Sequence, residues 1–550
     1  MDSNSRRLAI ALALTALALL WSWWRDAQPV PVADGPATRL QCISYAPSGG
    51  QYVPLRPVTR EEIRRDLAVL AQRTGCVRTY TVSDGFDHVP AVAGELGLEV
   101  ILGAWIGREA DHNEREVALA IDVARRHRDT IRAIVVGNEV LLRHELPPDQ
   151  LAALVRRVGT ATGLPVTYAD VWGFWVKHRV LSDTVSFVTV HIIPYWDDDP
   201  VGIDAVIPYV DELYAEMRRQ FPGKEVLIGE TGWPSTGRPR GANEPGRVNQ
   251  ARYVREFAAL AERRGIRYNL IEAFDQPWKR LPEGTVGGHW GLYDVDAREK
   301  FPWTGPVAEV PHGATVVAWA VVAGVLGGLL ALLWGGASRG RGALLLAAGA
   351  ALLVGIGARQ AQDLLLGNAT TLDWIATLVV ASAGWLAFAL ALRFLTRPVR
   401  DLDPMPPLLT LLLLASCAYV CLGLAFAGRH RDFPVWLFLP GALGLVLSAA
   451  AVPSARAAAL HRGRGTEFVL LAAWLVVAGL LIPLQEGFQN GRSIGWGAVS
   501  LLLGSAILLP LALQARQHQR AAEHADARPG ESVEHHADRA DRDGKDGRRG

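Results

Sequence analysis

Apolar residues fall into two patterns along the chain. Between about residues 40 and 301, short β-branched runs alternate with stretches in which apolar residues recur at helical spacing. From residue 313 onward, long apolar runs with few charges replace this alternation. The pattern therefore predicts a water-facing α/β domain followed by a set of helices in a lipid bilayer.

Eight β-branched runs in the first region predict eight strands. The predicted strands are 40–46, 76–82, 99–105, 131–139, 165–171, 186–195, 225–230 and 268–274. Helical stretches separate them, and the first opens with Thr59 and Glu62 in a capping-box pattern. Eight strand–helix units in about 260 residues match the size of a (β/α)8 TIM barrel. An open, doubly wound sheet is the alternative, but no glycine-rich phosphate loop follows the first predicted strand.

Several apolar runs are long enough to cross a membrane. Residues 8–24 form an uncharged run that ends in tryptophans rather than in a small-residue cleavage site. This predicts a retained signal anchor rather than a cleaved signal peptide, with Trp21, Trp23 and Trp24 at the membrane interface. Further runs of spanning length, about seven in number, lie at 314–335, 342–358, 374–395, 406–427, 434–452, 467–484 and 494–514.

The connections between these runs differ in arginine content. The connections at 338–342, 393–400 and 454–465 are rich in arginine, those at 359–373 and 485–493 are not, and the short 428–433 is a mild exception. The positive-inside rule then places the amino terminus and the arginine-rich connections in the cytoplasm. We therefore expect a multi-pass membrane protein whose first domain lies outside the cytoplasm.

This orientation divides the chain into four parts. They are an anchor (1–25), an external TIM-barrel domain (26–312), an all-α transmembrane bundle (313–515) and a cytoplasmic tail (516–550). The tail is almost free of apolar residues, which predicts disorder. Its histidines are expected to be solvated rather than metal-bound.

Composition and charge narrow the function classes. Lys and Arg number 56 against 55 Asp and Glu, and a net charge of +1 excludes a nucleic-acid binder that works by bulk positive charge. Four cysteines in 550 residues exclude a disulfide-stapled scaffold, and no Cys or His pair has zinc-ligand spacing. We predict no metal and no cofactor. Cys42 and Cys76 lie on adjacent predicted strands, and the sequence leaves open whether they form a disulfide or remain buried thiols.

Two of the predicted strands end in a glutamate. Glu139 follows VVGN and Glu230 follows VLIG, and in a TIM barrel the chemistry lies at these carboxyl ends. Retaining glycoside cleavage needs two carboxyl groups about 5–5.5 Å apart, one to protonate the departing oxygen and one to attack the anomeric carbon. On this pattern alone, two solvated surface charges remain the alternative.

Five ordered segments carry a family resemblance. They are VRTY (77–80), VGNE (136–139), GETGWPSTG (229–237), EAFDQPWK (272–279) and HWGLYD (289–294). Together they resemble glycoside hydrolase family 17, most closely its fungal and bacterial β-1,3-glucanase and glucan-transferase branch. The resemblance spans roughly 41–301 and implies a TIM barrel, retention of configuration and a β-glucan substrate. It says nothing about residues 313–550.

The resemblance also assigns roles to residues. It implies that Glu139 is the acid/base, that Glu230 is the nucleophile and that Asn138 binds the 2-hydroxyl of the sugar. Tyr195 is expected to hydrogen-bond the nucleophile and keep it ionised. Arg78 is expected either to support the same negative charge or to form a structural ion pair.

The remaining predicted sugar contacts come from the matched motifs. They are Tyr80, Trp233, Glu272, Asp275, Trp278 and Trp290. The tryptophans are included because the C–H face of a sugar ring stacks on aromatic rings. A purely structural role is the alternative for Asp275, and core packing is equally compatible with Trp172 and Trp175.

Other membrane functions fit the sequence less well. A glycosyltransferase would need a donor-binding domain around DLDP (401–404), a transporter would carry charges inside its spans, and a non-catalytic glucan-binding barrel would not need both glutamates. We therefore expect residues 26–312 to be the periplasmic catalytic domain of a multi-pass protein of the bacterial inner membrane. This enzyme would act on external β-glucan and resembles the β-(1,6)-glucan synthases. Transfer is favoured over hydrolysis, which stays the alternative, because nucleotide sugars are not normally present outside the membrane. The expected partners are a β-glucan, the lipid bilayer and a membrane glucan synthase, with no nucleic acid.

Overall fold

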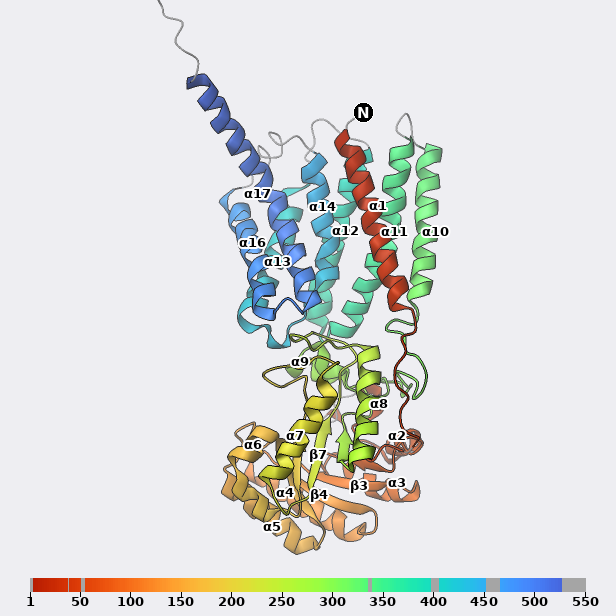
Figure 1. Ribbon diagram of the computed structural model, residues 1–550, viewed down its shortest axis with the longest axis vertical. Helices are drawn as coiled ribbons and strands as arrows, with labels where there is room; N and C mark the ends of the chain where they lie inside the picture. Colours follow the sequence, from red (N-terminus) through yellow and green to blue (C-terminus); the bar gives the residue numbers. More distant parts are fainter. Residues whose placement is uncertain are drawn as a thin grey trace, which may run out of the picture.

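The molecule consists of a barrel and a helical bundle stacked along its longest axis (Figure 1). The computed structural model describes residues 3–37, 39–50, 55–334, 339–396, 405–451 and 465–526. DLDP (401–404), most of the arginine-rich connections and the end of the predicted tail lie outside these residues.

The first domain is a closed parallel barrel. Within the described residues, β1 to β8 pair in chain order and β8 pairs back with β1. The strands are β1 (Ile43–Ser44), β2 (Cys76–Arg78), β3 (Glu99–Ala104), β4 (Ile131–Asn138), β5 (Val166–Val171), β6 (Val188–His191), β7 (Val226–Thr231) and β8 (Arg267–Leu270). The predicted TIM barrel is confirmed, and the doubly wound sheet is excluded because the sheet closes on itself.

Amphipathic helices surround this barrel. They are α2 (Arg60–Leu70), α3 (Val89–Glu95), α4 (Ala110–Arg126), α5 (Pro148–Thr162), α6 (Trp172–Lys177), α7 (Val206–Gln220) and α8 (Arg247–Arg264), with the short α9 (Arg280–Glu283) after β8. In α4, for example, Val117, Ala120 and Ala124 are buried at helical spacing against the strands. Thr59 and Glu62 form the predicted capping box at the start of α2.

A small apolar cluster joins several strands of the barrel. It contains Cys42, Cys76, Ile101, Val135, Ala169 and Leu227. The structure pairs Cys42 with Cys76 as a disulfide, which decides between the two states that the sequence leaves open.

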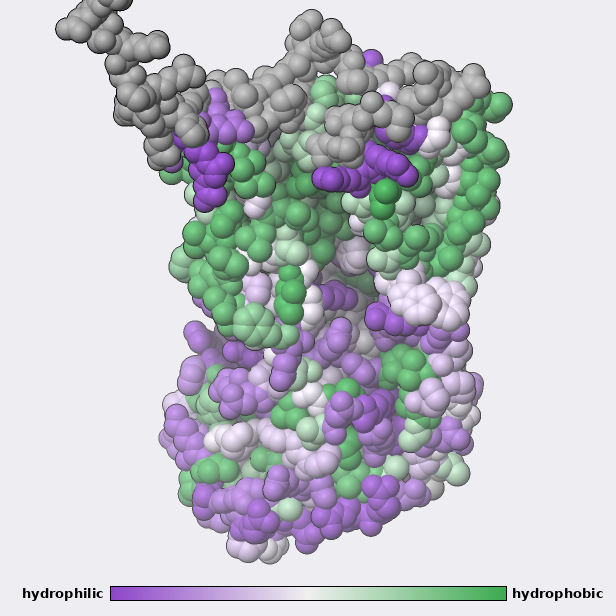
Figure 2. All heavy atoms as spheres, turned by 45° about the horizontal axis from the view of Figure 1, so that its top comes forward, coloured by the Kyte–Doolittle hydropathy of each residue, from purple (hydrophilic) through white to green (hydrophobic). Residues whose placement is uncertain are grey.

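The second body is a bundle of apolar helices. Its members are α1 (Ser3–Asp26), α10 (Gly313–Trp334), α11 (Arg339–Gly367), α12 (Thr371–Thr396), α13 (Pro407–Ala427), α14 (Val435–Ala451), α16 (Thr466–Glu486) and α17 (Gly491–Asp526). Seven helices in the described part of the chain are long and apolar enough to cross a membrane, and α14 is shorter. Apolar side chains cover the outside of the bundle, whereas polar side chains dominate the barrel surface (Figure 2). This difference supports a bundle in contact with lipid.

The amino-terminal helix packs inside the bundle. Trp23 is fully buried, and its indole N–H donates to the carbonyl oxygen of Gly355 in α11 at 3.0 Å. The guanidinium of Arg359 lies 3.9 Å from the centre of the Trp23 ring. Trp23 thus packs against α11, whereas Trp21 and Trp24 are exposed, and the interfacial position of these tryptophans stays a prediction.

The last helix extends further than the sequence suggests. Residues 516–526, which the sequence assigns to the disordered tail, continue α17. This stretch contains Ala, Gln, Arg and Glu, which favour helix even without an apolar face. The remainder of the predicted tail lies outside the described residues.

The barrel lies at the arginine-poor end of the bundle. The connections at 368–370, 428–434 and 487–490 face it, whereas α1 begins at the opposite end (Figure 1). Contacts across the junction include Arg280 Nη1, which donates to the Leu366 carbonyl oxygen at 2.8 Å, and Asn490 Nδ2, which donates to the Pro239 carbonyl oxygen at 3.2 Å. The barrel is thus on the side that the positive-inside rule predicts to be external.

Reporter fusions test this orientation. Fusions after residues 340, 400 and 460 are expected to report a cytoplasmic position, and fusions near 200, 365 and 488 an external one, because arginine-rich connections are retained inside. The measurement is the ratio of a periplasm-active to a cytoplasm-active reporter. External readings at both 400 and 460 would overturn the orientation.

Candidate active site

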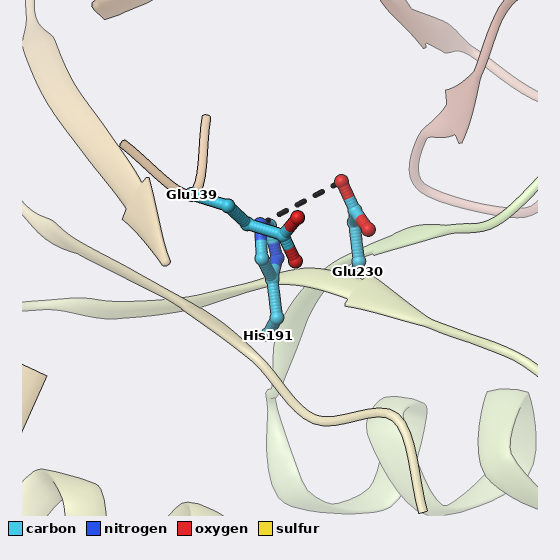
Figure 3. A group of neighbouring side chains, drawn as sticks. All are labelled: Glu139, His191 and Glu230. Atoms are coloured by element: carbon cyan, nitrogen blue, oxygen red, sulfur yellow. Dashed lines mark ion pairs between the residues drawn. The ribbon is translucent and has the colours of Figure 1, made fainter. Parts of the chain in front are cut away.

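Three side chains from β4, β6 and β7 converge at the carboxyl end of the barrel. Glu139 directly follows β4, His191 ends β6 and Glu230 lies in β7. One carboxylate oxygen of each glutamate and a ring nitrogen of His191 lie within 4.8 Å of one another, and Figure 3 shows the three side chains facing a common centre. The closed barrel thus brings together two glutamates that are 91 positions apart in sequence (230 − 139).

The backbone before Glu139 depends on glycine. Gly137 has a φ of +85°, and a Cβ there would lie 2.8 Å from the side chain of Val140. The pairing of β4 with β5 shifts register between Val135 and Asn138, and Glu139 itself has a φ of +53°. This local departure from regular strand geometry lets Glu139 leave the sheet and enter the cleft.

Glu230 is held by a buried arginine. Arg78 Nη1 lies 3.1 Å from Glu230 Oε1, and the same nitrogen donates to the carbonyl oxygen of Gly229 at 2.8 Å. A Cβ at Gly229 would lie 2.4 Å from the side chain of Thr189, so the strand before the glutamate requires glycine. His191 Nε2 is 3.6 Å from the same carboxylate oxygen.

This environment keeps Glu230 ionised. Burial alone would raise the pKa of Glu230, but the charges of His191 and Arg78 and a hydrogen bond from Tyr80 outweigh it and lower the pKa below its ordinary value. Burial lowers the pKa of His191 to about 4, so that its ring is neutral at neutral pH. Arg78 is therefore the cation that stabilises the Glu230 carboxylate under those conditions.

Glu139 has the opposite tendency. Burial, followed by the negative charges of Glu230 and Asp170, raises the pKa of Glu139 to about 8. The positive charge of Arg143, whose Nη1 lies 3.8 Å from Glu139 Oε2, opposes this rise. At neutral pH the pair therefore has one proton, on Glu139. A protonated carboxyl beside an ionised one is the equipment for acid-assisted attack at an anomeric carbon.

Arg143 offers a test of this electrostatic picture. Arg143→Gln is expected to raise the pKa of Glu139 further, because the cation that favours the charged form is removed. The alkaline limb of the kcat/KM pH profile should then move from about 8 to higher pH. Arg157→Gln, at an exposed arginine paired with Glu114, is the control and should leave the limb in place. A limb that moves to lower pH in Arg143→Gln would contradict the assignment.

The amide of Asn138 is fixed by its neighbours. Its side-chain oxygen accepts a hydrogen bond from Arg78 Nη2 at 2.5 Å and lies 3.0 Å from His191 Nε2. Because the oxygen is engaged, the NH₂ group is the part that can donate to a sugar hydroxyl. This geometry is compatible with the predicted contact to the 2-hydroxyl.

A metal ion could in principle bind among the same groups. Glu139, His191 and Glu230 each offer one ligand atom, but the Arg78 guanidinium already neutralises Glu230. A cation at this point would occupy the space between the two carboxyl groups and compete with a sugar.

Comparison with known proteins identifies the barrel. Residues 42–291 match the family model of the BtgE/BtgC glycoside hydrolase domain. The chain is 30% identical to a glucan 1,3-beta-glucosidase of Schizosaccharomyces pombe over 234 residues. The matched region covers 39% of this chain and 72% of the relative. The chain belongs to glycoside hydrolase family 17.

The chain is also similar to other proteins over the same region. A glucan 1,3-beta-glucosidase of Arthroderma benhamiae is 27% identical over 258 residues, covering 44% of this chain and 83% of that protein. The crystal structure of a family 17 beta-1,3-glucanosyltransferase from Rhizomucor miehei matches 49% of this chain and 97% of its own, with 26% identity and a TM-score of 0.43. As a family 17 member, the chain is a glycosidase or transglycosylase. The family model ends at residue 291, before the helical bundle.

The family 17 barrel opens into one large cleft. It has a volume of about 1160 Å³ and is lined by Glu139 and Glu230 together with Tyr80, Glu272 and Trp290. Small-molecule pockets usually measure about 300–1,000 Å³. The cleft therefore has room for several sugar units.

Two further predicted contacts lie in this cleft. The Tyr80 hydroxyl lies 3.0 Å from Ser44 Oγ, within hydrogen-bonding distance, and its ring packs against Arg78. Glu272 is 2% exposed and pairs with Lys279 at 2.7 Å, and burial raises the pKa of Glu272 to about 7. Lys279, which also lines the cleft, was not predicted.

The predicted contact between Tyr195 and the nucleophile is wrong. The Tyr195 hydroxyl donates to the carbonyl oxygen of Arg238 at 2.7 Å, and its ring packs edge-on against Trp290. Tyr195 lies four residues after the end of β6, so the chain has already turned away from Glu230. Its phenol supports the loop that follows β7.

Trp233 and Asp275 are structural rather than exposed to the cleft. Trp233 is fully buried, stacks on Tyr253 and donates to the carbonyl oxygen of Glu244 at 3.1 Å, so the predicted sugar platform is wrong. Asp275 pairs with Lys300 at 2.8 Å, which favours its structural alternative.

The aromatic lining of the cleft differs from the prediction. In the part of the chain that the structure describes, the cleft wall does not include Trp278. The indole N–H of Trp278 donates to Gln276 Oε1 at 3.0 Å. Trp172, at the end of β5, and Trp196, beyond β6, line the cleft. Their positions just after predicted strands were the signal that could have identified them.

Proposed function

We propose that the chain is a retaining β-1,3-glucan transglycosylase that builds or branches β-glucan outside the cytoplasmic membrane, with β-1,6 linkages among its products. The observation that carries this proposal is the pair of adjacent carboxyl groups with opposite protonation in a cleft large enough for an oligosaccharide. The names of the relatives, glucan 1,3-beta-glucosidase and beta-1,3-glucanosyltransferase, support the substrate class.

The first chemical step forms a covalent intermediate. Glu230 attacks the anomeric carbon while Glu139 gives its proton to the glycosidic oxygen, so the C–O bond breaks and the leaving chain departs as an alcohol. One carboxylate oxygen of Glu139 lies within 4.8 Å of one of Glu230. This separation is compatible with retaining enzymes, whose two carboxyl groups are about 5–5.5 Å apart, rather than with inverting enzymes, in which they are about 6.5–9.5 Å apart.

The second step uses Glu139 as a base. Once Glu230 is esterified, its negative charge is gone, and one of the charges that raises the pKa of Glu139 disappears with it. Glu139 is now a carboxylate. It accepts the proton of an incoming hydroxyl, which attacks the anomeric carbon and releases Glu230.

The choice between sugar and water as acceptor decides the activity. Water is abundant, so transfer requires an acceptor sugar held in line, and orientation of this kind is worth effective molarities of roughly 10⁵–10⁸ M. The aromatic side chains of Trp172 and Trp196, which line the same cleft as the carboxyl pair, offer surfaces for such a sugar. New linkages made outside the membrane reuse the energy of a cleaved bond, and we propose a membrane glucan synthase as the source of the donor chain.

Product analysis tests the proposal. The purified full chain, incubated with β-1,3-gluco-oligosaccharides, is expected to give products longer than the starting sugar, increasingly so as the substrate concentration rises. Mass spectrometry measures product length, and linkage analysis identifies any 1,6 bonds. Shorter sugars alone, even at high substrate concentration, would exclude the transferase and leave a membrane-anchored β-1,3-glucanase.

A further inference from the structure

The membrane bundle contributes to the wall of the catalytic cleft. Arg429 and His430 line the same cleft as Glu139 and Glu230. Both belong to η7 (Gly428–His430), the short helical turn between α13 and α14, which lies at the barrel end of the bundle (Figure 1). The site therefore contains two side chains from a part of the chain that the family model does not reach.

Buried contacts fix this segment to the barrel. The Arg238 side chain is 6% exposed, forms an ion pair with Glu486 and donates to the Arg431 carbonyl oxygen at 2.5 Å. Its guanidinium also lies 4.5 Å from the centre of the Phe433 ring. Thr285 adds a hydrogen bond to Asp432. Contacts from one buried cation of the barrel to three residues of the bundle hold the connection in a defined position.

The backbones approach closely at the same point. Gly284 has a φ of +74°, and a Cβ there would lie 2.3 Å from the carbonyl oxygen of His430. His430 Nδ1 lies 3.2 Å from the carbonyl oxygen of Glu283, which itself lines the cleft. The loop after β8 thus leaves room for the bundle segment only because it has glycine at this position.

On the cleft side, the two bundle residues meet an aromatic ring of the barrel. The ring of His430 lies 5.6 Å from that of Trp196, and the guanidinium of Arg429 lies 5.9 Å from it. Both side chains are exposed, whereas Trp196 is half-buried. An aromatic face beside guanidinium and imidazole groups suits a sugar, whose C–H face stacks on the ring while its hydroxyl groups accept and donate hydrogen bonds.

We infer that Arg429 and His430 of the bundle form a glucan subsite together with Trp196 of the barrel. This subsite positions the glucan at a distance from the reacting bond. This inference rests on the proposed function. Arg238 and Thr285 also hold the segment through buried contacts, so docking does not depend on Arg429 and His430 alone, and the exposed parts of these two side chains can bind a ligand. The bundle is then part of the substrate-binding surface as well as an anchor.

Chain-length dependence tests the inference on the full chain in detergent or nanodiscs. Arg429→Ala and His430→Ala are compared with Arg431→Ala, the control on the same segment, whose side chain lies against α13 near Gly423. The kcat and KM are measured for an activated aryl β-glucoside and for β-1,3-gluco-oligosaccharides of increasing length. In the two cleft variants, the ratio of kcat/KM for long chains to that for the aryl glycoside is expected to fall about tenfold, mainly through KM. Arg431→Ala should keep the wild-type ratio.

The outcomes separate this inference from the proposed function. An equal loss for all substrates, an unchanged ratio, or the same fall in Arg431→Ala would each overturn the subsite. Thermal unfolding of each variant shows whether the bundle has been disturbed. Failure of the wild-type chain to act on any β-1,3-gluco-oligosaccharide would instead overturn the proposed function itself.

Discussion

Replacing Glu230 with Gln is expected to abolish formation of the glycosyl-enzyme, with a loss of at least about 10⁴-fold in kcat/KM. The amide is nearly the same size and can still accept a hydrogen bond from Arg78, but it has no negative charge and is a poor nucleophile. The loss should be the same for activated and unactivated leaving groups, because bond formation to the anomeric carbon fails in both cases. The measurement is kcat/KM on an aryl β-glucoside and on β-1,3-gluco-oligosaccharides.

Glu225→Gln is the matched control for this variant. Glu225 immediately precedes β7 but is surface-exposed and pairs with Arg267 at 2.5 Å. Exposed pairs contribute about 0–1 kcal/mol to stability, so activity and unfolding temperature should stay near those of the wild type. If Glu230→Gln keeps the turnover of the wild type, as Glu225→Gln is expected to do, the catalytic interpretation of the carboxyl pair is wrong.

Glu139→Gln is expected to have an effect that depends on the leaving group. Oligosaccharides leave poorly without a proton, so their cleavage should slow by about 10²–10⁴-fold, whereas an activated aryl glycoside should still react in the first step. Added azide should restore the second step, because this anion attacks the intermediate without a general base. Kinetics with a series of aryl leaving groups, with and without azide, measure both effects.

The pH profile gives a second readout of the same variant. The wild type requires a protonated Glu139, so kcat/KM should fall as the pH rises past about 8, and a second fall is expected in acid as Glu230 becomes protonated below its usual range. The alkaline limb should disappear in Glu139→Gln and stay in Glu114→Gln, a control at an exposed glutamate. Azide rescue of Glu230→Gln instead of Glu139→Gln would show that the two roles are reversed.

The sequence predicts the barrel well because its signals are local. Each predicted β-branched run overlaps a strand of the barrel. The motifs VGNE and GETGWPSTG each place a glycine before the glutamate, at Gly137 and Gly229, where the structure has no room for a Cβ. The two glutamates could be placed together because parallel strands in a barrel all end at one rim. Their opposite pKa shifts depend on burial and on Arg78, which only the folded structure defines.

The errors have a common physical origin. Membership in a motif does not say which side of the backbone a side chain occupies, so Trp233 in the core and Trp290 in the cleft looked equivalent. Tyr195 was placed by its position at the end of a predicted strand, but β6 ends at His191. Arg429 lies far along the chain in the connection between α13 and α14, and its contact with the cleft follows only from the docking of the two bodies.

Covalent trapping tests the central claim most directly. The full chain is incubated with an activated 2-deoxy-2-fluoro-β-glucosyl donor, whose fluorine slows the second step more than the first, and the digested protein is analysed by mass spectrometry. The account predicts one added glycosyl group, on the peptide that contains Glu230, and none in Glu230→Gln. A glycosyl group on another residue, or unchanged turnover with no labelled peptide, would contradict it.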